Sequence, residues 1–105
     1  MTTIVVLFNL KSDADVKAYE QWAKTTDLPT VRGLKSVDGF DVFRTAGLLG
    51  KADQAAPYQY VELIEISDME GFGAECATDT MRKVAGEFQA FADGPCFMLS
   101  ERLDR

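Results

Sequence analysis

The order in which strand-like and helix-like hydrophobic patterns follow one another constrains the fold of this chain more than any single motif. Strand-like segments are residues 3–10, 35–44, 58–66 and 96–103, and helical spacing covers residues 13–26 and 67–92. The order strand, helix, strand, strand, helix, strand predicts the α+β ferredoxin-like βαββαβ fold. In this fold two helices cover one face of a four-stranded antiparallel sheet. The 105 residues fit one such domain, residues 1–105.

Polar residues and a proline predict where the helices begin and end. Ser12 or Asp13 is expected to cap the first helix, because both side chains can accept hydrogen bonds from exposed backbone N–H groups. We expect this helix to end before Pro29, since the residue preceding a proline avoids helical geometry. Ser67, followed three residues later by Glu70, fits a capping box at the start of the second helix.

The first strand is apolar on both of its faces. Ile4, Val6 and Phe8 share one side, and Val5 and Leu7 share the other. Helices cover only one side of such a sheet, and an exposed apolar face of this size is costly in water. We therefore expect two copies of the chain to pack sheet against sheet, which gives a homodimer with a barrel-like interior, a dimeric α+β barrel.

The composition limits the binding partners and the cellular location that can be expected. The formal net charge is −6 and the 11 basic residues form no runs, which argues against binding to nucleic acid or to an anionic membrane surface. No apolar stretch approaches the roughly 20 residues of a membrane span. The first residues lack the pattern of a signal peptide, so a cytoplasmic location is expected. Cys76 and Cys96 show neither redox nor metal-ligand spacing and are expected to be inert.

The chain contains no histidine, which limits the chemistry that it can perform. Ser-His-Asp and Cys-His nucleophilic sites are excluded, and the commonest ligand of zinc and non-haem iron is missing. The segment AGLLGK lacks the spacing of a phosphate-binding loop. We therefore expect neither a metal nor a cofactor, and we expect carboxylates or tyrosines to act as acid–base groups.

Glu62 is the first candidate for such a group. In the strand YQYVELIEI it shares a face with Tyr58 and Tyr60, and that face turns aliphatic at Ile64. If this face lines a dry cavity, burial would raise the pKa of Glu62 and allow proton transfer near neutral pH. We expect the face to form half of an enclosed wall that a second subunit completes. The alternative is a structural ion pair between Glu62 and Arg44.

Further polar residues are candidates for contact with a substrate. Asp27 is the second catalytic candidate; alternatively it forms a turn before Pro29. Tyr58 and Tyr60 could stack on a flat ligand, pack at a dimer interface, or do both. Arg44 could bind a ligand carboxylate or carbonyl, or protect an edge strand.

The remaining candidates are Asn9 and residues on the two helices. Asn9 could orient a polar group of a ligand, although a turn into the first helix is the favoured interpretation. Tyr19 and Trp22 lie three residues apart on the first helix and are expected mainly in the core, with a pocket wall as the alternative. From the apolar stripe of the second helix, Phe72 and Met81 are expected to contact the ligand.

Four segments, YEQWAKTTDLPTVRGLKSV, DGFDVFR, YQYVELIEI and FADGP, cover most of the chain. Through them the chain resembles the RedY/HapK-like family of the dimeric α+β barrel superfamily. The resemblance implies a homodimer that holds a small hydrophobic, often aromatic or heteroaromatic molecule, with the Asp-Leu-Pro element of residues 27–29 at the pocket rim. It also implies a role in prodiginine-type or other secondary-metabolite pathways. Many enzymes of the superfamily carry a pocket histidine, and this chain departs from them.

Three functions fit these expectations. The first is a cofactor-free tailoring enzyme, of dehydratase or lyase type, that performs dehydration or condensation on an aromatic or heterocyclic secondary metabolite. The second is a cofactor-free monooxygenase of the same fold. The third is a non-catalytic carrier of a pathway intermediate. Acid–base chemistry by a Glu/Asp pair with tyrosines favours the first, whereas the fold by itself does not decide.

Overall fold

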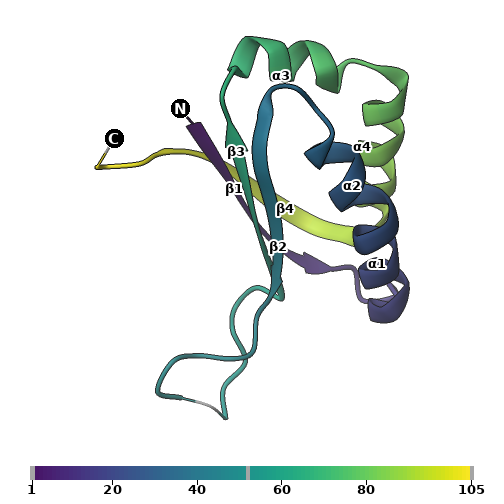
Figure 1. Ribbon diagram of the computed structural model, residues 1–105. Helices are drawn as coiled ribbons and strands as arrows, with labels where there is room; N and C mark the ends of the chain where they lie inside the picture. The colour runs from purple at the N-terminus through teal and green to yellow at the C-terminus, as the bar shows by residue number, and fades with distance from the viewer. Residues whose placement is uncertain (1, 52, 105) are drawn as a thin grey trace.

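The computed structural model describes residues 2–51 and 53–104. Its strands are β1 (Thr2–Leu10), β2 (Val37–Arg44), β3 (Tyr60–Ile66) and β4 (Ala92–Glu101). Its helices are α1 (Val16–Trp22), the π-helical turn η1 (Ala23–Asp27), α2 (Leu28–Arg32), α3 (Met69–Cys76) and α4 (Asp79–Phe91). This order, drawn in Figure 1, confirms the predicted ferredoxin-like βαββαβ arrangement.

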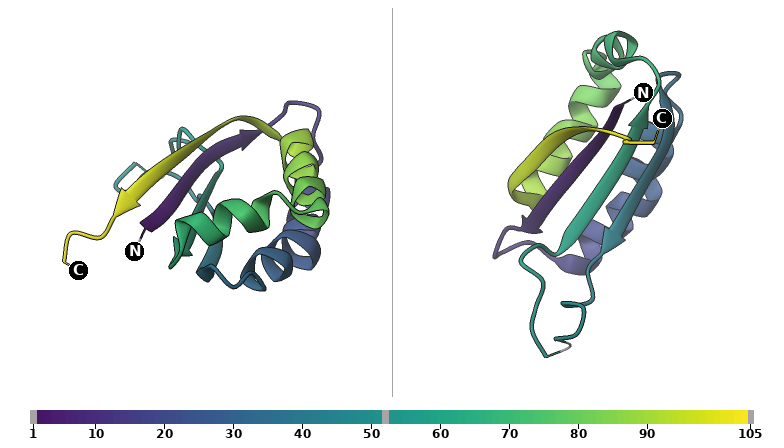
Figure 2. Two further views of the ribbon diagram at one scale, coloured as in Figure 1. Left: turned by 90° about the horizontal axis from the view of Figure 1, so that it is seen from above. Right: turned by 90° about the vertical axis from the view of Figure 1, so that its left-hand side faces the viewer.

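The four strands form one antiparallel sheet in the order β2-β3-β1-β4. β1 and β3 therefore occupy the middle of the sheet, and β2 and β4 are its edges. Figure 1 and the left view of Figure 2 show the helices gathered on one side of the sheet. The right view of Figure 2 looks onto the opposite side, which no helix of the described residues covers. The helices and the sheet thus form two layers.

The hydrophobic core lies between these two layers. Alternate residues of β1 from Ile4 to Leu10 are buried against the helices, as are alternate residues of β3 from Tyr60 to Ile66. The helices contribute Tyr19, Ala23, Val31, Met81, Val84 and Phe88. Each large apolar side chain that leaves water in this way stabilises the fold by about 1.5–3 kcal/mol, so this interface accounts for much of the cohesion of the chain.

The opposite side of the sheet carries apolar residues that a single chain leaves half-buried or exposed. The register places Leu63 and Met98 on either side of Val5, with Leu7 further along the same face. Phe43 is 50% exposed and Met98 is 39% exposed, whereas Val5 and Leu7 are half-buried. We call these five residues the uncovered sheet face. The expectation that β1 is buried on both sides is therefore met on one side only within one chain.

The first helical stretch is longer than predicted. It begins at Val16, where Asp15 rather than Ser12 or Asp13 is the cap, and it continues past Pro29 to Arg32. A proline has no N–H to donate and clashes with the carbonyl four residues earlier in a regular α-helix. The π turn η1 widens the helix just before this point, because the Leu28 N–H donates to the Ala23 carbonyl, five residues back. The helix therefore passes the proline without ending.

The second helical stretch is broken where one continuous helix was predicted. Asp68, not Ser67, caps α3 by accepting a hydrogen bond from the Gly71 N–H at 3.0 Å. The stretch stops at Cys76 and restarts after Thr78, whose hydroxyl accepts from the Met81 N–H. Because Thr78 has extended backbone geometry, α4 can turn relative to α3 and lie across the sheet.

Candidate functional site

A cavity of about 140 Å³ lies between the sheet and the helices. Its wall is mostly apolar, with Phe40 and Ile64 from the sheet and Phe72, Met81 and Phe88 from the helices. The polar side chains in the wall are Asp27, Glu62 and Gln89. Both predicted catalytic carboxylates, and Phe72 and Met81 from the second helical stretch, thus meet in one cavity.

Glu62 occupies the middle of β3 and faces the helices. Alternate residues of β3 from Tyr60 to Ile66 point toward the core, so Glu62 is only 4% exposed. Its Oε2 atom has no hydrogen-bond partner among the described residues. Burial raises the pKa of Glu62 to about 8, and the neighbouring charge of Asp27 adds to this shift. The carboxyl group therefore holds its proton far more strongly than one in water.

Asp27 is the last residue of the π turn η1 and is 5% exposed. It does not lie at a helix C-terminus, as the sequence suggested, but inside the continuous helical stretch. Burial raises the pKa of Asp27 to about 7. Single π turns occur frequently at functional sites, because the inserted residue changes which side chains point inward. Here the turn immediately precedes Pro29, so the proline and the buried carboxyl group belong to one local feature.

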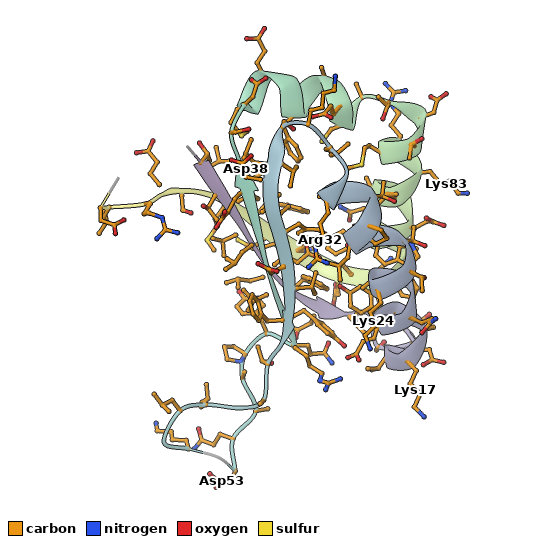
Figure 3. The ribbon with its side chains drawn as sticks, in the orientation of Figure 1. Lys17, Lys24, Arg32, Asp38, Asp53 and Lys83 are labelled. Atoms are coloured by element: carbon orange, nitrogen blue, oxygen red, sulfur yellow. The ribbon has the colours of Figure 1, made fainter. Side chains whose placement is uncertain are left out.

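No cation offsets this pair of carboxyl groups among residues 2–51 and 53–104. The ion pairs of the described chain join Arg32 to Asp41 and Arg44 to Glu20. Lys17 and Lys83 lie on the outer side of the helical layer and point away from the sheet (Figure 3). Two close carboxyl groups without a cation resist simultaneous ionisation, so the pair retains a proton near neutral pH.

Arg44 does not pair with Glu62, and the predicted structural alternative for Glu62 is therefore wrong. Its Nη1 donates to both carboxylate oxygens of Glu20, at 2.8 and 3.0 Å. The hydroxyl of Tyr60 donates to the same carboxylate at 2.7 Å. Arg44 ends an edge strand and its side chain is largely exposed, so it lies outside the cavity that contains Glu62.

The face of β3 that carries Tyr60 and Glu62 is covered by the helices of the same chain. The prediction that a second subunit completes this wall is wrong for both residues. Tyr60 stacks on Phe8, with ring centroids 5.4 Å apart, and lines two other cavities of about 410 and 220 Å³. Tyr58 precedes the strand and is partly exposed, outside the cavity of Asp27 and Glu62.

Asn9 and Trp22 also lie outside the wall of that cavity. Asn9 fixes the start of β3, because its Oδ1 accepts from the Gln59 N–H at 2.9 Å and its Nδ2 donates to the Pro57 carbonyl at 3.2 Å. The Nε1 of Trp22 donates to Glu87 at 3.2 Å, which ties α1 to α4. The geometry thus gives both residues structural contacts.

Tyr19, which the sequence assigned mainly to the core with a pocket wall as the alternative, lines the cavity of about 220 Å³ and not the one that contains Asp27 and Glu62. It is fully buried, and its hydroxyl has no hydrogen-bond partner among the described residues. The charges of Glu62 and Asp27 both act on this hydroxyl and, after burial, are the main causes that raise the pKa of Tyr19. The available signal was a tyrosine in an apolar stripe, where phenylalanine would suffice for packing.

The described residues bring together no group of three or more His, Cys, Asp or Glu side chains that could hold a metal ion. Within the same residues, no helix is both long enough and apolar enough to cross a membrane.

Comparison with known proteins gives a match over nearly the whole chain. The sequence model of the family described as "REDY-like protein HapK" matches residues 2–103. The chain is similar to HapK from Hahella chejuensis, with 32% identity, a TM-score of 0.78, and coverage of 100% of this chain and 95% of that one. No functionally curated protein matches the sequence.

Remote solved structures share the fold. A dimeric ferredoxin-like protein of unknown function from Thermobifida fusca is 13% identical, with a TM-score of 0.75 and coverage of 96% of this chain and 90% of that one. Hydroxynitrile lyase from Passiflora edulis is 12% identical, with a TM-score of 0.75 and coverage of 94% and 90%. At these identities the likeness concerns the fold alone.

Proposed function

This chain belongs to the family of REDY-like HapK proteins, and from that premise we propose that it is a cofactor-free tailoring enzyme acting on an aromatic or heterocyclic secondary metabolite. The observation that carries the proposal is the pair Asp27 and Glu62. Both carboxyl groups are buried in one apolar cavity, without a cation, and their pKa values of about 7 and about 8 bracket physiological pH.

The proposed reaction is a dehydration in which the two carboxyl groups divide the roles of base and acid. The Asp27 carboxylate, with the lower pKa, removes a proton from the carbon next to a substrate carbonyl. The Glu62 carboxylic acid gives its proton to a hydroxyl group on the adjacent carbon. The C–H and C–O bonds break, a C=C bond forms, and water leaves. Proton exchange with solvent then restores both groups. Condensation followed by loss of water uses the same two groups.

The size and walls of the cavity support a ring-bearing substrate. A cavity of about 150 Å³ lined by apolar side chains suffices to bind benzene in another protein. The cavity here measures about 140 Å³, and Phe72 and Phe88 supply aromatic surface. One ring therefore fits inside, and a larger metabolite would extend outward past Phe97, which lines the cavity and is 55% exposed.

The uncovered sheet face supports a homodimer formed by sheet-against-sheet packing. The Thermobifida fusca neighbour of the same fold is described as dimeric. In this arrangement each subunit keeps its own cavity between sheet and helices, because the carboxyl groups lie on the face opposite to the dimer contact.

A glutamine at position 62 tests the proposal. The probe substrate is the aldol adduct of benzaldehyde and acetone, a β-hydroxy ketone whose dehydration product, benzylideneacetone, absorbs strongly in the ultraviolet. We expect Glu62→Gln to lower the dehydration rate by about 100-fold or more, since it keeps the shape but removes the titrating proton. Glu65→Gln, on the opposite face of the same strand, is the matched control and should leave the rate unchanged.

The same assay separates the alternatives. A carrier would show no protein-dependent dehydration, and equal rates for Glu62→Gln and the wild type would contradict the acid–base role. A monooxygenase would require oxygen, whereas the proposed reaction proceeds at the same rate when oxygen is removed.

A further inference from the structure

The Tyr19 hydroxyl is an unmatched polar atom in the interior. It is fully buried and finds no partner among the described residues. A buried donor without a partner is unfavourable, and phenylalanine would fill the same volume without that penalty. Folding alone therefore does not explain why the residue carries a hydroxyl group.

Aromatic neighbours hold the ring of Tyr19 in place. Tyr60 packs against it with its centroid 4.9 Å away, Phe91 at 5.5 Å and Phe8 at 5.8 Å, all three in edge-to-face geometry. Rings packed from three sides keep the side chain in one rotamer. The hydroxyl therefore cannot swing toward another protein group, and its partner has to come to it.

The surroundings of the hydroxyl indicate what that partner is. Tyr19 lines the cavity of about 220 Å³ that Tyr60 also lines, together with Leu28, Val42 and the charged residues Glu20, Lys24 and Arg44. Leu28 follows Asp27 in the chain, and Val42 pairs directly with Glu62 across the sheet. Tyr19 thus lines the neighbouring cavity, and the charges of both carboxyl groups act on its hydroxyl. Glu62 Oε2 is the other unpaired side-chain oxygen at this place.

We propose that the Tyr19 hydroxyl donates a hydrogen bond to a carbonyl oxygen of the bound ligand. The ligand class is then a single aromatic or heteroaromatic ring that carries a carbonyl group, with the ring in the 140 Å³ cavity beside Glu62 and the oxygen directed toward Tyr19, which lines the 220 Å³ cavity. This inference rests on the proposed function, because it places the ring of the ligand in the same cavity. It gives Tyr19 the role of polarising the carbonyl whose neighbouring carbon loses a proton.

Two compounds of nearly equal shape test the assignment. Acetophenone carries the carbonyl oxygen, and α-methylstyrene replaces that oxygen with a methylene group. Their dissociation constants are measured by NMR titration with the whole protein. We expect the wild type to bind acetophenone with a dissociation constant about tenfold lower, because one hydrogen bond in a buried site contributes about that much affinity. Tyr19→Phe should remove this preference and leave the affinity for α-methylstyrene unchanged.

Tyr60→Phe is the matched control, because Tyr60 is also a buried tyrosine but its hydroxyl already bonds to Glu20. It should keep the preference for acetophenone and lower the melting temperature, whereas Tyr19→Phe should melt at the same temperature as the wild type or higher. A preference that survives Tyr19→Phe would overturn the assignment. The assignment would also be overturned if Tyr19→Phe lost affinity for both compounds equally or had a lowered melting temperature. Failure of the wild type to bind acetophenone would overturn it as well.

The binding test and the turnover test fail independently. Loss of the acetophenone preference depends only on the Tyr19 hydroxyl, whether or not Glu62 transfers a proton. An unchanged dehydration rate in Glu62→Gln would contradict the proposed catalysis but would not affect the carbonyl-binding role of Tyr19.

Discussion

At the scale of single residues, burial rather than residue type decides which carboxylate is chemically unusual. Glu62 and Glu65 lie on the same strand, yet Glu62 faces the helices and Glu65 the opposite side. The two-residue period and the lack of histidine were enough to select Glu62 as a candidate acid–base group. They could not identify the ion-pair partner of Arg44, because Glu20 reaches it from another element, 24 residues away.

The buried carboxyl groups predict an unusual dependence of stability on pH. Folding raises the pKa of Asp27 from 3.8 to about 7 and that of Glu62 from 4.5 to about 8. Between about pH 5 and about pH 8 the folded protein therefore binds more protons than the unfolded chain, and the free energy of unfolding falls as pH rises. Each group contributes at most about 1.4 kcal/mol per pH unit.

Chemical denaturation across this pH range measures the effect. In Glu62→Gln the free energy of unfolding should fall less steeply as pH rises, most clearly above about pH 7, where Asp27 has largely ionised. Glu65→Gln should retain the slope of the wild type. Stability that rises with pH in the wild type would show that these carboxyl groups are ionised in the folded state.

At the scale of elements, the sequence predicted the kind and order of the elements but not their ends. Hydrophobic periodicity extends over many residues, so it survived local exceptions. Ends depend on single hydrogen bonds and on backbone geometry, and here several polar residues competed for each cap. The passage of the helix through Pro29 could not be predicted from periodicity, since it depends on the π turn before it.

The cap of α1 is a direct test at this scale. Asp15 Oδ1 accepts from the Lys17 N–H at 2.9 Å and the Ala18 N–H at 3.3 Å. Asp15→Ala should therefore lower the free energy of unfolding by about 1 kcal/mol. Asp13→Ala removes the same charge two residues earlier, where the helix has not begun, and should have little effect in the same urea titration. Equal effects of the two changes would indicate that charge rather than capping is responsible.

At the scale of the whole molecule, one sheet separates two different surfaces. The helix-covered side contains the carboxyl pair, and the uncovered sheet face is suited to a second copy of the chain. Alternation in β3 showed which residues share a side but could not show which side the helices take, because both sides of β1 are apolar. For this reason the sequence correctly grouped Tyr60 with Glu62 on one face, but it predicted a second subunit against that face where the helices of the same chain lie.

A charge on the uncovered sheet face should separate the proposed dimer. Val5 lies in the middle of that face, between Leu63 and Met98, so Val5→Glu would bury an unpaired carboxylate at the contact. Sedimentation should give twice the chain mass of 11.6 kDa for the wild type and the single mass for the variant. Gln21→Glu, on the exposed side of α1, should remain dimeric. A monomeric wild type would contradict sheet-against-sheet packing.

The ionisation of Glu62 itself can be followed through the NMR signal of its side-chain carboxyl carbon during a pH titration. We expect a Glu62 midpoint near pH 8 and a neighbouring transition of Asp27 near pH 7. In Asp27→Asn the Glu62 midpoint should be lower, because that change removes the adjacent charge. A Glu62 midpoint near 4.5, the value of an ordinary glutamate, would contradict a buried, proton-holding carboxyl pair and with it the proposed acid–base chemistry.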